Sequence, residues 1–515
     1  MLSFTALTTS AFLGLIVYLF VKRRRAGLPL PPGPKKYPLI GNLLNMPTSL
    51  EWETFHKWSQ QLDSDIIHLT VAGTSMVVID TAETAMELLE KRSSIYSSRP
   101  RMPMLNELCG YDFHFGLMPY GDRWREHRKL FHQSFSPAAS KVFRPKILKS
   151  THGLLRRILN DQPDVDLFAH LLHLSGETIL SITYGLNILP KDDLCFAAAE
   201  EGKTTIIAVG VPGAFLVDSF PILAHLPDWM PFTGFKRKAK EWKAAAHNLV
   251  EVPFDAAMRK IETGDSGPSF LSRSLENVPD SQGPRYFKTI IKATAGSAYN
   301  AGVDLTISCI ATSILALLAN PSVLKKAQQE IDTVIGTDQL PDFDDHDSLP
   351  YVTAVVKESL RWKAVAPLGV PHLLEVEDKY KGYRLPAGSV VIPNVWAMLH
   401  DENVYPDPFI FNPERFMKDG KLNPDMRDPD HAAFGFGRRI CPGQSTAYDA
   451  IWIAIVLMIA TLDITKLING NGEAIEPTYE YLTGLLCRPA PFKCSLKPRS
   501  TEAENLIRAT ASNYI

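Results

Sequence analysis

A glycine-rich segment at residues 434–443 contains a cysteine in a position that suits a metal ligand. It reads Phe-Gly-Phe-Gly-Arg-Arg-Ile-Cys-Pro-Gly, and the mostly apolar run that follows, residues 447–459, predicts a buried helix. Cys441 would stand just before a helix N-terminus, where free N–H groups and the helix dipole lower a thiol pKa. Arg439 would add positive charge there. On residue type alone a buried structural cysteine remains the alternative, and the local pattern favours a thiolate ligand.

The spacing within this segment matches a known signature. Phe434, Gly437, Arg439, Cys441 and Gly443 occupy every fixed place of F-x-x-G-x-R-x-C-x-G. The chain therefore resembles the cytochrome P-450 family, in which this pattern binds haem. The resemblance implies haem b with Cys441 as the axial thiolate of the iron, and Phe434 and Arg439 among the residues that hold the cofactor.

Two further patterns imply contacts with the haem propionates. Trp124 and Arg128 are four residues apart on a predicted helix and share one face. By themselves they indicate packing or a cation–π contact, but they match the family's W-x-x-x-R, in which both side chains reach a propionate. His372, in the extended segment Pro-Leu-Gly-Val-Pro-His, is implied to donate to the second propionate. Arginine suits a carboxylate because its donors form a fork.

A third pattern implies a structural triad. Glu358 and Arg361 are three residues apart on a helix that begins near Pro350, a spacing that usually means a surface ion pair. They match the family's E-x-x-R, and Arg415 in Pro-Glu-Arg-Phe supplies the third member. A buried Glu–Arg–Arg group is costly unless it is fully hydrogen-bonded, so the resemblance implies a structural lock.

A long proline-free helix is predicted over residues 287–319. Its middle reads Ala-Gly-Val-Asp-Leu-Thr from residue 301, and two small residues there leave space for a flat group. It resembles the family's oxygen-binding segment A-G-x-D-T-T, except that Leu305 replaces the threonine that takes part in proton delivery. Adjacent helical positions point about 100° apart, so Thr306 needs a kink or π-bulge to substitute for it. Asp304 and Thr306 are the predicted catalytic residues, with ordered water or a polar group of the substrate as alternatives.

The substrate pocket is predicted from the same resemblance. Residues 99–120 form one wall, and the apolar segment 202–235 forms a lid, although ordinary core packing also explains its aromatic residues. The expected lining residues are Leu105, Phe113, Phe215, Ala301, Leu305, Leu368, Val370 and Leu485.

The chain ends and the composition predict the domain organisation. Residues 2–21 are uncharged and read as a single transmembrane anchor, with a cleaved signal peptide as the alternative. Residues 22–47 carry a basic stop and a proline-rich hinge, residues 48–497 form the catalytic domain, and residues 498–515 form a mobile polar tail. The basic stop predicts a single-pass protein of the endoplasmic reticulum membrane with a cytosolic catalytic domain.

Charge and cysteine content exclude several classes of protein. A net charge of −2 makes nucleic acid an improbable partner, and six scattered cysteines argue against a disulfide scaffold or a zinc site. The fold class expected is mainly α with a small β region. Strands are expected at residues 66–70 and 76–79, and a β-hairpin from residues 383–385 and 389–392, whereas residues 263–285 read as a surface loop.

The resemblance implies a haem-thiolate monooxygenase that inserts one atom of O2 into a lipophilic small molecule such as a terpenoid, a polyketide or a lipid. No G-x-G-x-x-G motif is present, so electrons would come from NADPH through a separate flavoprotein reductase. Tyr-Gly-Asp-Arg-Trp-Arg and Pro-Asp-Pro-Phe-Ile-Phe-Asn-Pro-Glu-Arg-Phe are most similar to fungal secondary-metabolism members. Leu305 keeps open a haem-thiolate isomerase or dehydratase acting without O2 or reductase. A non-catalytic haem sensor is a third reading.

Overall fold

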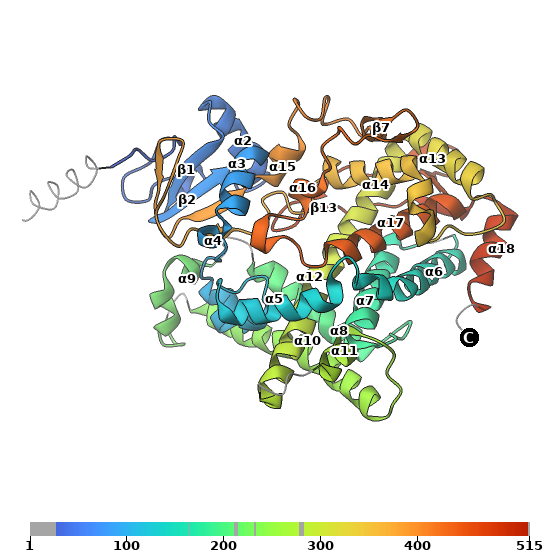
Figure 1. Ribbon diagram of the computed structural model, residues 1–515, viewed down its shortest axis with the longest axis horizontal. Coiled ribbons are helices and arrows are strands. Elements are labelled where there is room, and N and C mark those ends of the chain that lie inside the picture. Colours follow the sequence, from blue (N-terminus) through green and yellow to red (C-terminus); the bar gives the residue numbers. More distant parts are fainter. Residues whose placement is uncertain (1–26, 164, 211–214, 231–232, 278–282, 513–515) are drawn as a thin grey trace, which may run out of the picture.

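The computed structural model describes residues 27–512 apart from residues 164, 211–214, 231–232 and 278–282. The predicted anchor at residues 2–21 and the basic residues 22–25 lie outside the described residues. From residue 27 onward the architecture is mainly helical with a small β region, as predicted. Figure 1 shows the sheet at one end of the molecule and the helices around and beyond it.

One long helix, α12 (Pro284–Ala319), runs through the middle of the helical part (Figure 1). It begins with a proline at its first turn, contains no other proline, and ends before Pro321, which opens α13. The helices around it are α5 (Asp122–Phe135), α6 (Arg144–Asn160), α7 (Leu167–Tyr184), α8 (Leu194–Val209), α10 (Gly234–Glu262), α13 (Pro321–Val334), α14 (Pro350–Trp362) and α17 (Gln444–Thr461).

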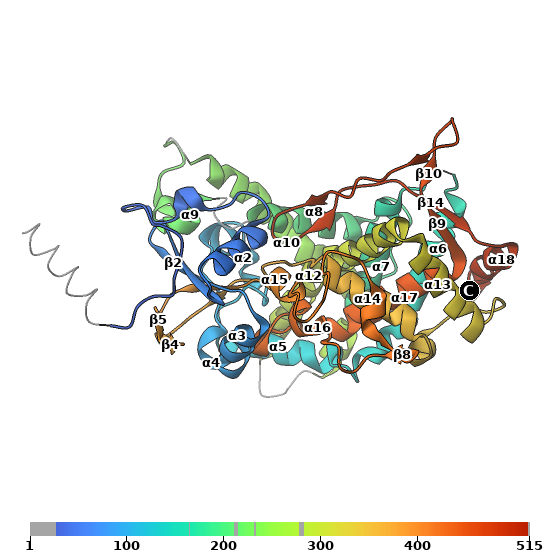
Figure 2. The ribbon, with the colours of Figure 1, turned by 90° about the horizontal axis from the view of Figure 1, so that it is seen from above.

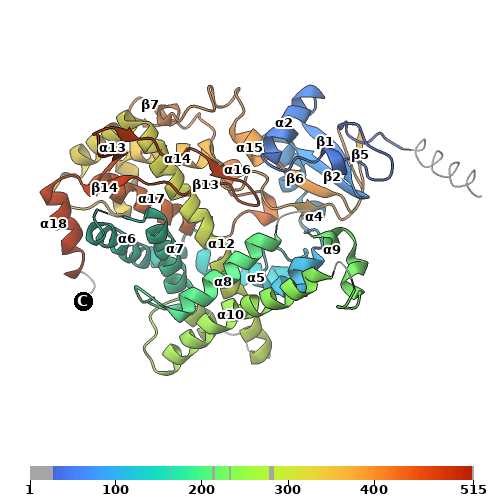
Figure 3. The same cartoon turned by 180° about the vertical axis from the view of Figure 1, so that it is seen from behind.

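Most of these helices pack on α12 directly. Contacts join it to α5, α7, α8, α10, α14 and α17. α8 and α10 lie against each other and cover one side of α12, as Figure 3 shows from behind. α12 and α17 are the two described helices that are long and apolar enough to cross a membrane, but most of each is buried inside the protein. They are therefore the core helices of this fold.

The main sheet has four strands in the order β1-β2-β6-β3. β1 (Ile66–Val71) and β2 (Thr74–Ile79) form the predicted antiparallel pair, and β2 runs parallel to β6 (Val390–Pro393). Figure 2 shows this sheet beside α2 (Glu51–Gln61), away from the main group of helices. β3 (His372–Leu373) pairs antiparallel with β6, which fixes the position of His372.

Small elements complete the described fold. Five two-stranded sheets join β4 (Asp378–Tyr380) to β5 (Tyr383–Leu385), β7 (Met417–Lys418) to β8 (Lys421–Leu422), β9 (Leu462–Thr465) to β14 (Ser495–Pro498), β10 (Leu467–Ile468) to β11 (Ala474–Ile475), and β12 (Tyr481–Leu482) to β13 (Arg488–Pro489). The short helices are α3 (Ala82–Ala85), α4 (Ser93–Tyr96), α9 (Leu216–Ser219), α11 (Phe270–Glu276), α15 (Val395–Leu399), α16 (Asp430–Ala433) and α18 (Thr501–Ala509).

Three predictions about local structure are wrong. Residues 383–385 and 390–393 do not form a hairpin together, because β5 pairs back to β4 while β6 joins the main sheet. The loop predicted over residues 263–285 contains α11, which starts at a capping box on Ser269 and buries Phe270. The segment after residue 498 is not simply a mobile tail, because α18 packs on α6 and α17 and buries Ile507.

Candidate active site

The segment around Cys441 is held in a tight turn before α17, as the sequence predicts. The Cys441 backbone N–H donates to the carbonyl of Phe434 over 2.7 Å, which closes the loop. Gly437 has φ +53°, and a Cβ on it would lie 2.3 Å from the carbonyl oxygen of Leu89. Only glycine satisfies both the left-handed backbone and this close approach, so the turn fixes where the sulfur lies.

The thiol of Cys441 needs a cation to become a thiolate. Burial raises its pKa, while the backbone N–H of Gly443 and the charge of Arg128 lower it to a smaller extent. The prediction of a lowered pKa is therefore wrong for the free thiol, although one predicted cause, the N–H donor, is present. The nearby cation is Arg128 and not Arg439. A metal ion bonded to the sulfur would supply the missing charge.

Three predicted cofactor residues gather around this loop. Arg128 on α5 donates through Nη1 to the carbonyl of Ile440 over 2.8 Å, directly before Cys441. Trp124, one turn earlier on α5, lies under the guanidinium of Arg439 at 4.5 Å from its ring centre. Arg439 itself donates to three carbonyls, those of residues 97, 115 and 118. The structure therefore brings Trp124, Arg128, Arg439 and Cys441 together.

His372 and an unpredicted arginine extend this group. His372 is buried, and its Nδ1 lies 2.8 Å from the carbonyl oxygen of Tyr96. Burial lowers its pKa well below the ordinary value, and the charges of Arg99 and Arg439 lower it further. Arg99 is 6% exposed and donates to the carbonyls of Val370 and Pro371. Sequence reasoning missed Arg99, whose only signal was a single charge between the polar segment 97–98 and Pro100.

We call Arg99, Arg128 and Arg439 the arginine cluster. Within the described part of the chain, no ion pair joins any of the three to a carboxylate, and their charges repel one another. Burial lowers the pKa of Arg439 to about 9, and the charge of Arg128 contributes to this shift. Burial also lowers the pKa of Arg99, and the charge of Arg439 lowers it further. Buried charges normally carry a partner. The cluster therefore lacks anionic charge, and a cofactor with two carboxylates beside a metal would supply it.

The predicted triad forms a complete network. The two Glu358 oxygens accept from Arg361 Nε and Nη2 at 2.7 and 2.9 Å, and Arg415 Nε donates to Glu358 at 3.2 Å. Glu358 and Arg361 have no exposed surface. Their remaining bonds go to backbone groups, such as Arg361 Nη1 to the carbonyl of Leu399. The group is thus fully hydrogen-bonded, the condition under which a buried triad is tolerated.

On α12, Ala301 and Leu305 retain accessible surface although the helix runs through the interior. They are four residues apart and share one face, so this face borders open space. Gly302 does not contribute to that space, because a Cβ on it would lie 2.8 Å from Ile179 of α7. Its small size is explained by helix packing. Only Ala301 of the two small residues leaves room on the open side.

The two predicted catalytic side chains are both engaged. α12 is α-helical without interruption, so no kink or π-bulge turns Thr306, whose hydroxyl donates to the carbonyl of Gly302 at 2.9 Å. Asp304 Oδ1 accepts from Lys203 on α8 at 3.0 Å. Lys203 also pairs with Glu200 at 2.6 Å, and Glu200 accepts from Tyr299. Asp304 is therefore tied to the helix that covers α12.

Three of the predicted pocket residues lie in one apolar cluster. Leu105, Phe113 and Phe215 pack with Ile206 and Val209 of α8. Leu485 lies near the C-terminal end of α8. A Cβ added to Gly210, which directly follows α8, would be 3.4 Å from the Cδ2 of Leu485.

Leu368 and Val370 are not among the residues of that apolar cluster. Leu368 packs on the cluster of Phe55, Ile67 and Ile392 beside the main sheet, and Val370 is 38% exposed. The contacts of these two side chains therefore do not join them to the apolar cluster of Leu105, Phe113 and Phe215.

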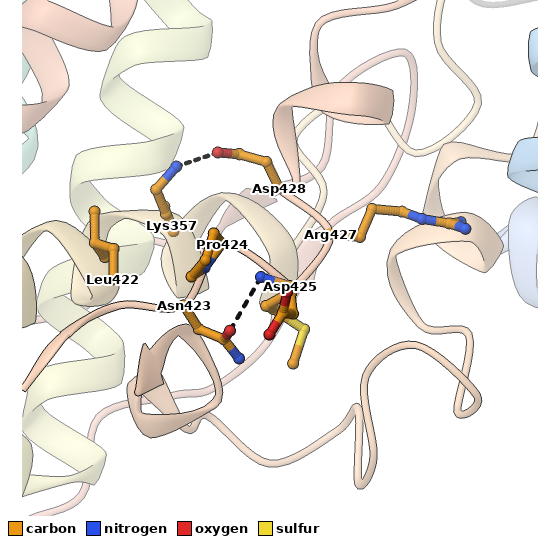
Figure 4. Close-up of a pocket in the computed structure, with 8 residues that line it drawn as sticks. Lys357, Leu422, Asn423, Pro424, Asp425, Arg427 and Asp428 are labelled. Carbon is orange, nitrogen blue, oxygen red and sulfur yellow. Dashed lines mark hydrogen bonds and ion pairs between the residues drawn. The ribbon is translucent and has the colours of Figure 1, made fainter. Parts of the chain in front are cut away.

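Two surface hollows are separate from this site. The larger, about 480 Å³, is lined by Lys357 and residues 422–428 (Figure 4). Lys357 pairs with Asp428 across it, and Asn423 accepts from the backbone N–H of Asp425. A second hollow of about 190 Å³ lies between α13, the end of α17 and α18. No predicted pocket residue lines either hollow, so neither is the substrate pocket.

Comparisons with known proteins agree with this geometry. A model of the family "Cytochrome P450" matches residues 31–496. The chain is 45% identical over 494 residues to cytochrome P450 monooxygenase 98 of Postia placenta, covering 95% of this chain and 94% of that protein. It is 43% identical to cytochrome P450 monooxygenase ple1 of Rhodocybe pseudopiperita, covering 93% and 91%, and 38% identical to tryptamine 4-monooxygenase of Psilocybe cyanescens, covering 95% and 96%.

The helical fold, the enclosed thiol and the arginine cluster fit a haem-thiolate protein. The chain belongs to the cytochrome P450 family, whose members use haem b ligated by a cysteine thiolate, and it is an oxidoreductase of the monooxygenase type.

Proposed function

We propose that this protein inserts one oxygen atom of O2 into a lipophilic small molecule of fungal secondary metabolism, such as a terpenoid or a polyketide. Electrons come from NADPH through a separate flavoprotein reductase. The carrying observation is that relatives up to 45% identical over 95% of the chain are named as monooxygenases, while the enclosed Cys441 thiol and the arginine cluster are both intact.

In this proposal the site residues divide the work of holding the cofactor. Cys441 would be the thiolate ligand of the haem iron, and the backbone N–H of Gly443 would donate to its sulfur. Phe434 would hold the loop, because its carbonyl accepts from the backbone N–H of Cys441. Trp124, Arg128, Arg439, His372 and Arg99 would hold the two propionates. When bound, haem b supplies the oxygen chemistry, and the protein orients the substrate and limits the access of water. Glu358, Arg361 and Arg415 act as a structural lock that positions the segment after α14.

Proton delivery in this proposal depends on Asp304. Leu305 offers no hydroxyl on the open face, and the Thr306 hydroxyl already donates within the helix. The Asp304 carboxylate is the remaining acid on this part of α12, and its Oδ1 is held by Lys203. Proton transfer therefore requires Asp304 to reach the open face directly or through ordered water.

The proposed location is the endoplasmic reticulum membrane, with a single N-terminal span and a cytosolic catalytic domain. Exposed apolar side chains near the start of the described chain and around α9 support contact with lipid, because solvated surfaces rarely carry so many large ones. Both groups lie at the end of the molecule that carries β1 and α9 (Figure 1). They are Leu39, Leu43, Leu44, Leu216, Phe220, Ile222 and Trp229.

Turnover with purified reductase tests the function. Haem-loaded protein, NADPH and reductase should consume O2 and convert a lipophilic substrate to a product with one added oxygen atom from ¹⁸O2. Conversion of an already oxygenated substrate without O2 or reductase would contradict the proposal. That result would assign the protein to the haem-thiolate isomerases or dehydratases instead.

A further inference from the structure

The first turns of α10 carry a basic face. Arg237, Lys240 and Lys243 are exposed and follow one another at intervals of three residues, so they share one side of the helix with Lys236. Lys236 pairs with Asp228 at 3.2 Å, whereas none of the other three forms an ion pair with a described residue. We call these four cations the basic face, and most of its charge is not balanced by the described part of the chain.

Large apolar side chains are exposed shortly before α10. Leu216, Ile222 and Trp229 are 68%, 74% and 82% exposed. Leu216 belongs to α9, Ile222 belongs to the short helix η6 (Pro221–His225), and Trp229 follows η6. We call these three side chains the apolar patch. An exposed group of this kind marks a surface that contacts a partner or a membrane.

Contacts between the two segments hold the apolar patch beside the basic face. Lys236 Nζ donates to the carbonyl of Leu226 and pairs with Asp228, so the first turn of α10 is tied to the segment after η6. The ring of Phe215, at the start of α9, packs edge-on against Trp242 of α10 with 5.9 Å between the ring centres. Figure 3 shows α9 at one end of α10. The apolar patch and the basic face therefore belong to one surface.

The length of the basic face suits a charged membrane surface. Seven residues separate Lys236 from Lys243, which corresponds to a rise of about 10 Å along the helix. This is about one Debye length at 0.1 M salt, so a negatively charged surface that touches the apolar patch acts on all four cations. Each lysine or arginine this close to anionic headgroups adds to the attraction, and neutral headgroups provide no such term.

We propose that the apolar patch and the basic face together bind a bilayer that contains anionic phospholipid. This inference rests on the proposed membrane location and deepens it, because it names the class of lipid. The apolar side chains enter the interface, and the ammonium and guanidinium groups contact the phosphates of the headgroups. Anionic lipid therefore determines how deeply the segment around Trp229 is inserted.

Quenching of Trp229 fluorescence by brominated lipid tests the inference in the full-length, haem-loaded protein. The protein is inserted into vesicles of phosphatidylcholine and into vesicles in which about a third of the lipid is phosphatidylserine, with equal brominated phosphatidylcholine in both. The contribution of Trp229 is the difference between wild type and Trp229→Phe. This contribution should be about twofold larger in the anionic vesicles, and about 0.5 M salt should remove the excess.

The triple variant Arg237→Gln, Lys240→Gln, Lys243→Gln, measured with and without Trp229→Phe, should lose the excess quenching. Its quenching in phosphatidylcholine alone should equal that of wild type. The matched control neutralises three exposed lysines that form no ion pair with a described residue and lie on α13, on β8 and just before β14. It should keep the excess; its changes are Lys325→Gln, Lys421→Gln and Lys493→Gln.

Two results would overturn the inference while leaving the membrane location intact. One is equal quenching of wild type in the two kinds of vesicle, which would point to an acidic protein surface as the partner of the cations. The other is an excess that survives the triple substitution. Failure of the proposed location itself would look different, because the protein would then float with neither kind of vesicle, and both proposals would fall.

Discussion

Two groups of buried arginines in this molecule differ in how their charge is balanced. Arg361 and Arg415 share the carboxylate of Glu358 at 2.7 and 3.2 Å, so that group is complete within the chain. Arg99, Arg128 and Arg439 are bonded to carbonyl groups, and the charge of Arg439 lowers the pKa of Arg99 while that of Arg128 lowers the pKa of Arg439. All of these arginines are buried except Arg128, which is half-buried. The triad is therefore complete within the chain, whereas the arginine cluster has no anionic partner among the described residues.

Because their charge is balanced differently, mutations in the two groups should have different effects. A change in the triad leaves a buried charge without its partner and acts on folding, with or without cofactor. A change in the arginine cluster removes a cation that only the cofactor balances, so it acts mainly on cofactor retention. The following experiments are ordered from the largest expected free-energy effect to the smallest.

Arg361→Ala should lower the free energy of unfolding by about 3–5 kcal/mol, because Glu358 is left buried without its main partner. Urea unfolding of the haem-free protein, followed by circular dichroism, measures the effect. Lys326→Ala, which removes an exposed partner of Glu414, is the control and should change stability by less than about 1 kcal/mol. A stable but slower Arg361→Ala enzyme would count against the structural lock.

Acid should destabilise the protein through His127, which joins α5 to Thr294 of α12 at 2.7 Å. Burial lowers its pKa from 6.5 to about 4, with a smaller effect of Arg123. The unfolded chain therefore takes up the proton first, and stability falls as the pH drops from about 6.5 to 4. The loss amounts to roughly 3 kcal/mol at most.

Unfolding at pH 7 and pH 5 tests this assignment with His127→Gln as the variant. The variant should lose less stability between the two pH values than wild type, because glutamine does not titrate. An equal loss in both proteins would show that other groups control acid unfolding in this range.

Arg128→Leu should weaken haem retention by about tenfold or more while changing the stability of haem-free protein by less than about 1.5 kcal/mol. Transfer of haem to an acceptor protein gives the rate of loss. Arg125→Leu is the matched control on the same helix, since Arg125 is exposed and pairs with Asp122. If Arg128→Leu retains haem as well as wild type, the arginine cluster does not bind the propionates.

Leu305→Thr should raise the product formed per NADPH by about twofold, since a hydroxyl on the open face shortens proton transfer. Leu305→Val is the control because valine has the shape of threonine without the hydroxyl. Asp304→Asn should reduce product in the same assay. If neither Leu305→Thr nor Asp304→Asn alters the ratio of product to peroxide, residues 304 and 305 do not govern proton delivery.

Sequence patterns predicted the parts of this molecule that depend on residues close together in the chain. The turn before α17, the length of α12 and the Glu358–Arg361 pair all follow from short spacings and were confirmed as structural features. Strand pairing was not predictable in the same way. β5 and β6 were both expected, but their partners are decided by packing over long separations.

The candidate site shows the same limit. The family signature identified Cys441, but the opposing effects of burial and Arg128 on its pKa depend on the folded surroundings. Arg99 has no local pattern and became visible only beside Arg439 and His372. Lys203 was missed for the same reason: nothing near it in sequence indicates an ion pair with a residue 101 positions away.

The carbon monoxide complex of the reduced protein tests the central claim most directly. Wild type should show the absorption band that is characteristic of thiolate ligation, because Cys441 is the soft ligand held at the N-terminus of α17. Cys441→Ala should lose that band completely, together with turnover. A Cys441→Ala protein that keeps the thiolate-type band would contradict the assignment of Cys441 as the haem ligand.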